Sequence, residues 1–139
     1  MAMSEMDYMN GGGFSEFKLW TNPNPPTAGT DNFNTQSITL SDDITNYELI
    51  KIVYKRTANI DESFIIIPAD ALAMSSYESG YYVFYLGFNG RSNGVLHPWF
   101  RRFYSPSNTI IQFDDCKAAD DLSLMYNNRL YPLEVIGMK

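Results

Sequence analysis

Short segments rich in aromatic and β-branched residues recur along this chain and constrain its fold more than any other feature. Gly, Pro, Asn and Asp separate these segments roughly every 10 residues, which is typical of all-β sandwiches. We therefore predict an antiparallel β-sandwich of the jelly-roll type, with a closed barrel of strands as the alternative architecture. The predicted strands are 14–20, 36–40, 47–55, 64–67, 81–88, 95–104, 109–113, 122–126 and 130–139.

The clearest of these segments is 47–55, which alternates apolar and charged residues with the period of a strand. Ile50, Ile52 and Tyr54 fall on one face, and Lys51 and Lys55 fall on the other. The continuous apolar run 64–67 predicts a fully buried strand, which Pro68 terminates because proline lacks an amide donor. One helical turn is predicted within 69–75.

The length of 139 residues fits one domain, predicted over 14–139. Residues 1–13 end in three consecutive glycines, and the entropic cost of ordering glycine predicts a flexible N-terminal arm. This segment carries Glu5 and Asp7 and lacks a continuous apolar stretch, so it does not resemble a signal peptide.

The charge of the chain argues against two classes of partner. A net charge of -6 and a pI near 4.6 are unsuited to binding nucleic acid, which depends on Lys and Arg neutralising phosphates. Anionic membrane surfaces are disfavoured for the same reason. We expect neither nucleic acid nor a membrane among the partners.

Few residues here can support catalysis or hold a metal. His97 and Cys116 are the single histidine and the single cysteine, so the usual zinc ligand sets cannot be completed from one chain. Acidic neighbours of Cys116 disfavour a reactive thiolate. The pairs Asp114-Asp115 and Asp120-Asp121 lack the spacing of a calcium-binding loop and indicate a solvated acidic connection over 114–121. We predict no enzymatic activity, no cofactor and no metal.

Two connections between strands are candidates for recognition. The Pro- and Asn-rich loop 22–32 is long enough to be a functional loop, although a plain connection across one end of a sandwich is the favoured interpretation. The segment 89–94 holds two Asn-Gly pairs, which favour the turn of a β-hairpin. The predicted recognition residues are Trp20, Asn22, Asn24, Asn89, Arg91, Asn93 and Trp99.

The segment 99–104, Trp-Phe-Arg-Arg-Phe-Tyr, has two interpretations. Aromatic residues interleaved with arginine can stack on sugars or bases and make cation–π contacts. Alternatively the aromatics fill the core, while Arg101 or Arg102 pairs with an acidic neighbour. The acidic balance of the chain favours the second interpretation.

Several stretches resemble a known group of proteins. Residues 19–25 (LWTNPNP), 36–40 (QSITL), 47–54 (YELIKIVY) and the ending 131–139 (YPLEVIGMK) are similar to small bacteriophage structural proteins encoded in tail or tail-fibre regions. The resemblance covers most of 19–139 and transfers no functional residue. It implies a virion protein made in the host cytoplasm, located at a tail fibre tip, baseplate or receptor-binding domain and commonly trimeric. Its implied partners are other virion proteins and a host-surface glycan or protein.

Three alternatives stay open beside a tail protein. A head fibre or capsid decoration protein is the nearest, with the N-terminal arm as its anchor. A free carbohydrate-binding module is predicted to be monomeric and to bind sugar through exposed aromatics. A small hydrolase is the weakest alternative, because His97 has no evident catalytic partners in the sequence.

Overall fold

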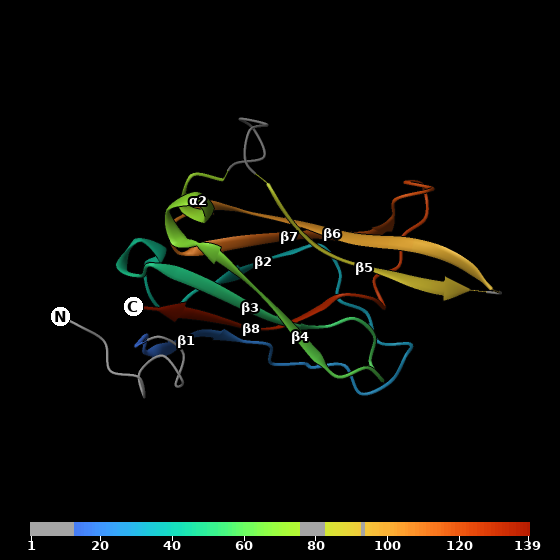
Figure 1. Cartoon of the computed structure of the whole chain (residues 1–139), viewed down its shortest axis with the longest axis horizontal. Helices are drawn as coiled ribbons and strands as arrows, with labels where there is room; N and C mark the ends of the chain where they lie inside the picture. The colour runs from blue at the N-terminus through green and yellow to red at the C-terminus, as the bar shows by residue number, and fades with distance from the viewer. Residues whose placement is uncertain (1–12, 76–82, 93) are drawn as a thin grey trace.

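The computed structural model describes residues 13–75, 83–92 and 94–139, and shows two four-stranded antiparallel sheets packed as a sandwich (Figure 1). The predicted fold class is confirmed. The predicted arm lies, apart from Gly13, outside the described residues. Among the described residues, no helix has the length and apolar character needed to cross a membrane.

One sheet, called here the β3 sheet, has the order β1-β8-β3-β4. The other, the β6 sheet, has the order β2-β7-β6-β5. The strands of the β3 sheet are β1 (Glu16–Thr21), β8 (Tyr131–Met138), β3 (Leu49–Lys55) and β4 (Glu62–Pro68). Those of the β6 sheet are β2 (Gln36–Thr39), β7 (Ile110–Ala118), β6 (Val95–Ser107) and β5 (Phe84–Ser92).

Strands far apart in sequence pair within each sheet. β1 lies beside β8 and β2 beside β7, which is the nested, jelly-roll-like part of the topology. β3 with β4, and β5 with β6, are antiparallel pairs of consecutive strands. The single helical turn predicted after Pro68 is present as α2 (Ala69–Ala73), and a 3-10 turn, η1 (Ile44–Asn46), precedes β3.

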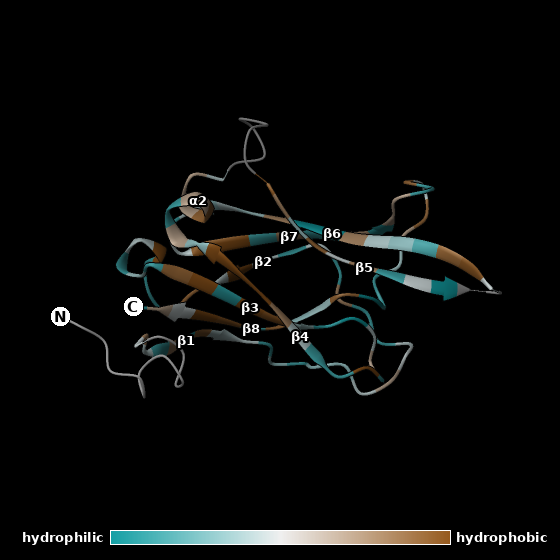
Figure 2. Ribbon diagram, viewed as in Figure 1, coloured by the Kyte–Doolittle hydropathy of each residue, from teal (hydrophilic) through white to brown (hydrophobic). Residues whose placement is uncertain are grey.

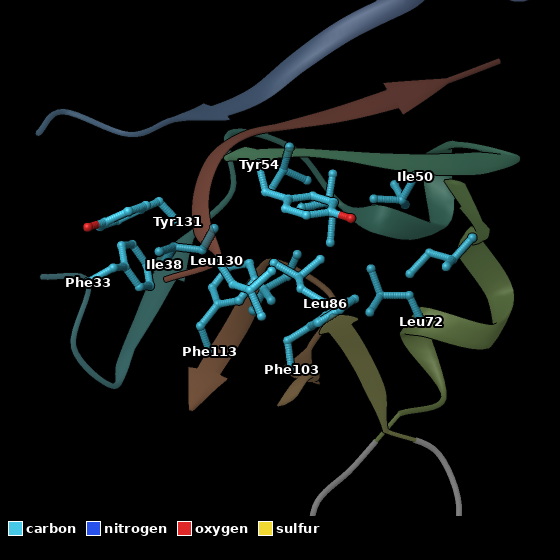
Figure 3. Packing of buried hydrophobic residues seen from close by; sticks show 14 of the residues in the cluster. Phe33, Ile38, Ile50, Tyr54, Leu72, Leu86, Phe103, Phe113, Leu130 and Tyr131 are labelled. Carbon is cyan, nitrogen blue, oxygen red and sulfur yellow. The ribbon is translucent and has the colours of Figure 1, made fainter. Parts of the chain in front are cut away.

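The core fills the space between the two sheets (Figure 3). Ile50, Ile52 and Tyr54 of β3 are buried, as their period-two spacing predicts. Phe103 and Phe113 face them from the β6 sheet, with their ring centroids 5.6 Å apart. Interdigitated aromatic and aliphatic side chains of this kind supply most of the stabilisation of a sandwich.

Arg101 is a charged side chain inside this core, with no exposed surface. Its guanidinium donates Nε to Leu130 O (2.8 Å), Nη1 to Asp114 O (2.7 Å) and Nη2 to Arg129 O (2.9 Å). Burial lowers its pKa to about 10, so the group keeps its charge at neutral pH. Leu130 has a φ of 52°, a region that side chains disfavour, and the hydrogen bond from Arg101 helps to hold it there.

Three predictions about strands are wrong. β4 is an edge strand and not a buried one, with Phe64 59% and Ile66 44% exposed. A short apolar run shows β propensity but not whether a neighbouring strand covers both faces. β7 continues through Asp114–Asp115 to Ala118, because these residues pair with β6, whereas 122–126 forms a loop with one isolated bridge from Met125 to Lys117.

The predicted hairpin tip 89–94 is also shorter than expected. Strand pairing continues from Phe84–Phe103 to Ser92–Val95, so Asn89, Gly90 and Arg91 belong to β5. Figure 2 shows hydrophilic residues at this end of β5 and hydrophobic ones along β3 and β4.

Candidate functional site

The outer face of the β6 sheet carries a groove of about 410 Å³, which we call the aromatic groove. This volume is within the range of small-ligand pockets, roughly 300–1,000 Å³. Its lining comes from β6, β7 and the ends of two loops. The lining residues are Thr35, Phe100, Arg102, Tyr104, Asp114, Asp115, Lys117 and Leu122.

Strand alternation explains why β6 supplies three of these residues. Successive side chains point to opposite faces of a sheet. Trp99, Arg101 and Phe103 therefore point inward and are buried. Phe100, Arg102 and Tyr104 point outward and are half-buried. The second interpretation of the segment 99–104 is confirmed for Trp99 and Phe103, which fill the core, and for Arg102, which pairs with Asp114. The structure places Phe100 and Tyr104 on the outer face, where stacking on a ligand stays a prediction.

The polar side of the groove is an ion pair between neighbouring strands. Arg102 Nε donates to Asp114 Oδ2 at 2.7 Å, and both side chains remain partly exposed. Lys117 lies opposite Phe100 on β7. Among the described residues of the lining, two cations, Arg102 and Lys117, balance two acidic residues, Asp114 and Asp115, so these side chains carry no net formal charge.

Asp115 ties the groove to two loops. Its Oδ1 accepts hydrogen bonds from Thr35 N (3.1 Å) and from Asn127 Nδ2 (2.8 Å). Burial acts to raise the pKa of Asp115, but these hydrogen bonds more than offset burial and hold the pKa below 3.8. Asn127 Oδ1 in turn accepts from Cys116 N (2.9 Å), which fixes the wall of the groove.

The edge strand β5 extends this surface. Tyr85 is 53% exposed, and its ring meets that of Phe100 edge-on at 5.6 Å. Gly87 pairs with Phe100, so the position of β5 directly opposite Phe100 carries no side chain. A Cβ atom at Gly87 would lie 3.3 Å from Trp99 O, which a small local shift can accommodate.

The predicted recognition residues occupy different positions. Asn24, Asn89 and Arg91 are exposed, and Arg91 Nη1 donates to Gly94 O at 3.3 Å. The β1–β2 loop and the β5–β6 hairpin lie toward the same end of the sandwich (Figure 1). Asn93 lies outside the described residues.

The other three predicted residues are held in packing roles. Asn22 is 8% exposed and donates Nδ2 to Pro132 O at 2.9 Å, while its Oδ1 accepts from Asn24 N at 2.8 Å. Trp20 is partly buried against the core. Trp99 is 6% exposed and stacks on Phe88 at 5.1 Å.

Sequence reasoning missed Phe100, Arg102 and Tyr104 as site residues. Period-two alternation through 99–104 was the available signal, because burying Trp99 and Phe103 exposes the residues between them. Asp114 has polar neighbours in the sequence, as loop residues do. The sequence therefore does not indicate that Asp114 lies beside Arg102. The ion pair depends on the β6–β7 register, which includes a shift between Arg101 and Phe103.

His97 and Cys116 have defined surroundings. His97 Nδ1 lies 2.8 Å from Asp120 Oδ2, so the fold supplies a carboxylate partner that the local sequence lacks. Cys116 is fully buried, and burial raises the pKa of its thiol to about 11. Within the part of the chain that the structure describes, no three His, Cys, Asp or Glu side chains come together as a metal site. No protein-family model and no curated protein sequence matches the chain.

Proposed function

We propose that this chain is a structural protein of a bacteriophage virion, located at the tail fibre or baseplate, that contacts the host surface through the aromatic groove. The groove is the observation that carries the recognition role. It joins half-buried aromatic rings to a preformed ion pair on the solvent-facing side of a sheet. The resemblance of the sequence to tail-region proteins supports the place in the virion.

The proposal includes no catalytic step. Cys116 is buried and its thiol pKa is about 11, so it does not supply a nucleophilic thiolate at neutral pH. Arg102, Asp114 and Asp115 of the groove are paired or hydrogen-bonded in ways that suit holding a ligand.

Assembly into a homo-oligomer, with a trimer favoured by the resemblance, is part of the same proposal. The outer face of the β3 sheet supports it, because exposed Phe64 and Ile66 lie beside ion pairs that cross the sheet. Lys51 Nζ is 2.8 Å from Glu16 Oε1, and Lys18 Nζ is 3.1 Å from Glu134 Oε1. Exposed apolar side chains beside polar and charged groups are typical of subunit interfaces.

The aromatic groove also suits a free carbohydrate-binding module, which is the second candidate. The two candidates differ in assembly and in location. A virion protein is expected to co-purify with particles and to form a closed oligomer, whereas a free module is expected to be monomeric.

The first test is mass spectrometry of gradient-purified particles separated into heads and tails. We expect the chain in the tail fraction, and its recovery with heads would indicate a head fibre or decoration protein instead. In a second test the purified chain competes with phage for adsorption to host cells. Full-length protein is expected to reduce adsorption, and absence from particles together with no competition would refute the proposal.

A further inference from the structure

We infer that the ligand of the aromatic groove is a neutral saccharide, with one sugar ring on Phe100 and its hydroxyls on the Arg102–Asp114 pair. The inference rests on the proposed recognition function and names its ligand class. Three features of the groove support it: the aromatic platform at Phe100, the ion pair and the charge balance.

The first feature is the apolar platform. Tyr85 meets Phe100 edge-on at 5.6 Å and supports its ring. Gly87, paired with Phe100 on β5, carries no side chain directly opposite it. A sugar presents a flat patch of C–H groups that packs on an aromatic ring, and the hydroxyls around that patch need polar partners close by.

The second feature supplies those polar partners. Arg102 is a donor only and ionised Asp114 is an acceptor only, and their side chains are in contact at 2.7 Å. Adjacent sugar hydroxyls act as donor and acceptor at once, so two of them can accept from the guanidinium and donate to the carboxylate. The ion pair fixes both side chains before the ligand arrives, which lowers the entropic cost of binding.

The third feature decides between neutral and anionic sugars. Arg102 and Lys117 are balanced by Asp114 and Asp115, and the whole chain carries a net charge of -6. Asp115 stays ionised because its hydrogen bonds hold its pKa below 3.8. A polyanionic glycan would meet repulsion from the chain without an unbalanced cation to offset it, whereas a neutral sugar would not.

The test is a printed array of neutral and anionic bacterial and plant glycans probed with the full-length chain, followed by calorimetric titration of the strongest neutral hit. We expect hits among neutral glycans. Phe100→Ala and Arg102→Met are expected to weaken binding at least about tenfold each, since hydrogen bonds to charged groups and aromatic stacking are each worth a factor of that order. Gly87→Val is expected to weaken binding, because its side chain would stand directly opposite Phe100 on the neighbouring strand.

Met74→Ala is the matched control, because it removes a 64% exposed apolar side chain at the end of α2, away from both the aromatic groove and the outer face of the β3 sheet. It is expected to leave binding unchanged, and thermal melts of every variant separate lost binding from lost folding. Hits confined to anionic glycans, no hits, or groove variants that bind like Met74→Ala would each overturn the inference.

Failure of this inference can be distinguished from failure of the proposed function. If the chain competes with phage adsorption but binds no neutral glycan, the ligand class is wrong and the recognition role stands. If the groove binds a neutral glycan but the chain is absent from particles, the virion role is wrong and the saccharide site stands.

Discussion

Replacing Arg101 with methionine tests the most unusual feature of the core. Arg101 is fully buried and donates three hydrogen bonds to the carbonyl oxygens of Leu130, Asp114 and Arg129. Its guanidinium also lies 5.1 Å from the centre of the Phe33 ring. Methionine has a similar length but no donors, so Arg101→Met leaves the three carbonyls without this partner.

The expected loss is about 3–5 kcal/mol in the free energy of unfolding. Leaving a buried acceptor unsatisfied costs about 1–3 kcal/mol, and two of the three carbonyls are only partly buried. Removing the guanidinium also removes its desolvation cost, which is several kcal/mol and limits the net loss. A loss of this size is a large part of a typical total stability of about 5–15 kcal/mol.

Urea denaturation followed by tryptophan fluorescence measures this loss. Arg102→Met is the matched control, because the neighbouring arginine forms a partly exposed ion pair that is worth about 1 kcal/mol or less. Arg101→Lys keeps the charge but not the planar fork, and should fall between the two. A cost of Arg101→Met no greater than that of Arg102→Met would refute a clamping role for Arg101.

Three further predictions concern stability and reactivity. Gly137→Ala should lower the free energy of unfolding by about 1–3 kcal/mol in urea denaturation, because its Cβ would lie 2.5 Å from Tyr47 Cδ1; an unchanged midpoint would contradict this. Acidification should reduce stability as pH falls below 3.8, because the pKa of Asp115 is lowered in the folded state and protonation then favours unfolding. Asp115→Asn should make the pH dependence of stability shallower, and an unaltered pH profile would count against it. Cys116 should react with a thiol reagent at pH 8 only when the protein unfolds, since burial raises its pKa to about 11; rapid labelling of the native protein would exclude this.

The strand positions could be predicted because the period of two appears directly in the sequence. Lys51 and Lys55 alternate with buried Ile50, Ile52 and Tyr54, so the alternation alone places β3 and orients its two faces. Helical structure after Pro68 was predicted equally well. Such local patterns are set by covalent geometry and by which side chains enter the core.

Neighbours across a sheet could not be predicted in the same way. Residues 64–67 do not indicate that β4 is an edge strand, because this depends on whether another strand pairs with the second side of β4. The same limit explains Asp114, whose polar sequence neighbourhood resembles a loop although it pairs with β6 and contacts Arg102. Arg102 and Asp114 are 12 residues apart in the sequence, and the register of their strands brings them together. Register belongs to the tertiary structure, and the candidate site is built from pairings of this kind.

Arg101 and Arg102 are adjacent on β6, and we expect the first to act in stability and the second in recognition. Arg101 points into the core and holds the chain ahead of β8, while Arg102 points outward and forms the polar half of the aromatic groove. Successive side chains of a strand point to opposite faces of the sheet, so Arg101 is buried in the core and Arg102 faces solvent. Arg101→Met is therefore expected to abolish ligand binding only under conditions in which it unfolds the chain, whereas Arg102→Met is expected to weaken binding in a protein that still melts like the wild type. Equal effects of the two variants on binding in fully folded protein would mean that the groove depends on the core beneath it as well as on its own side chains.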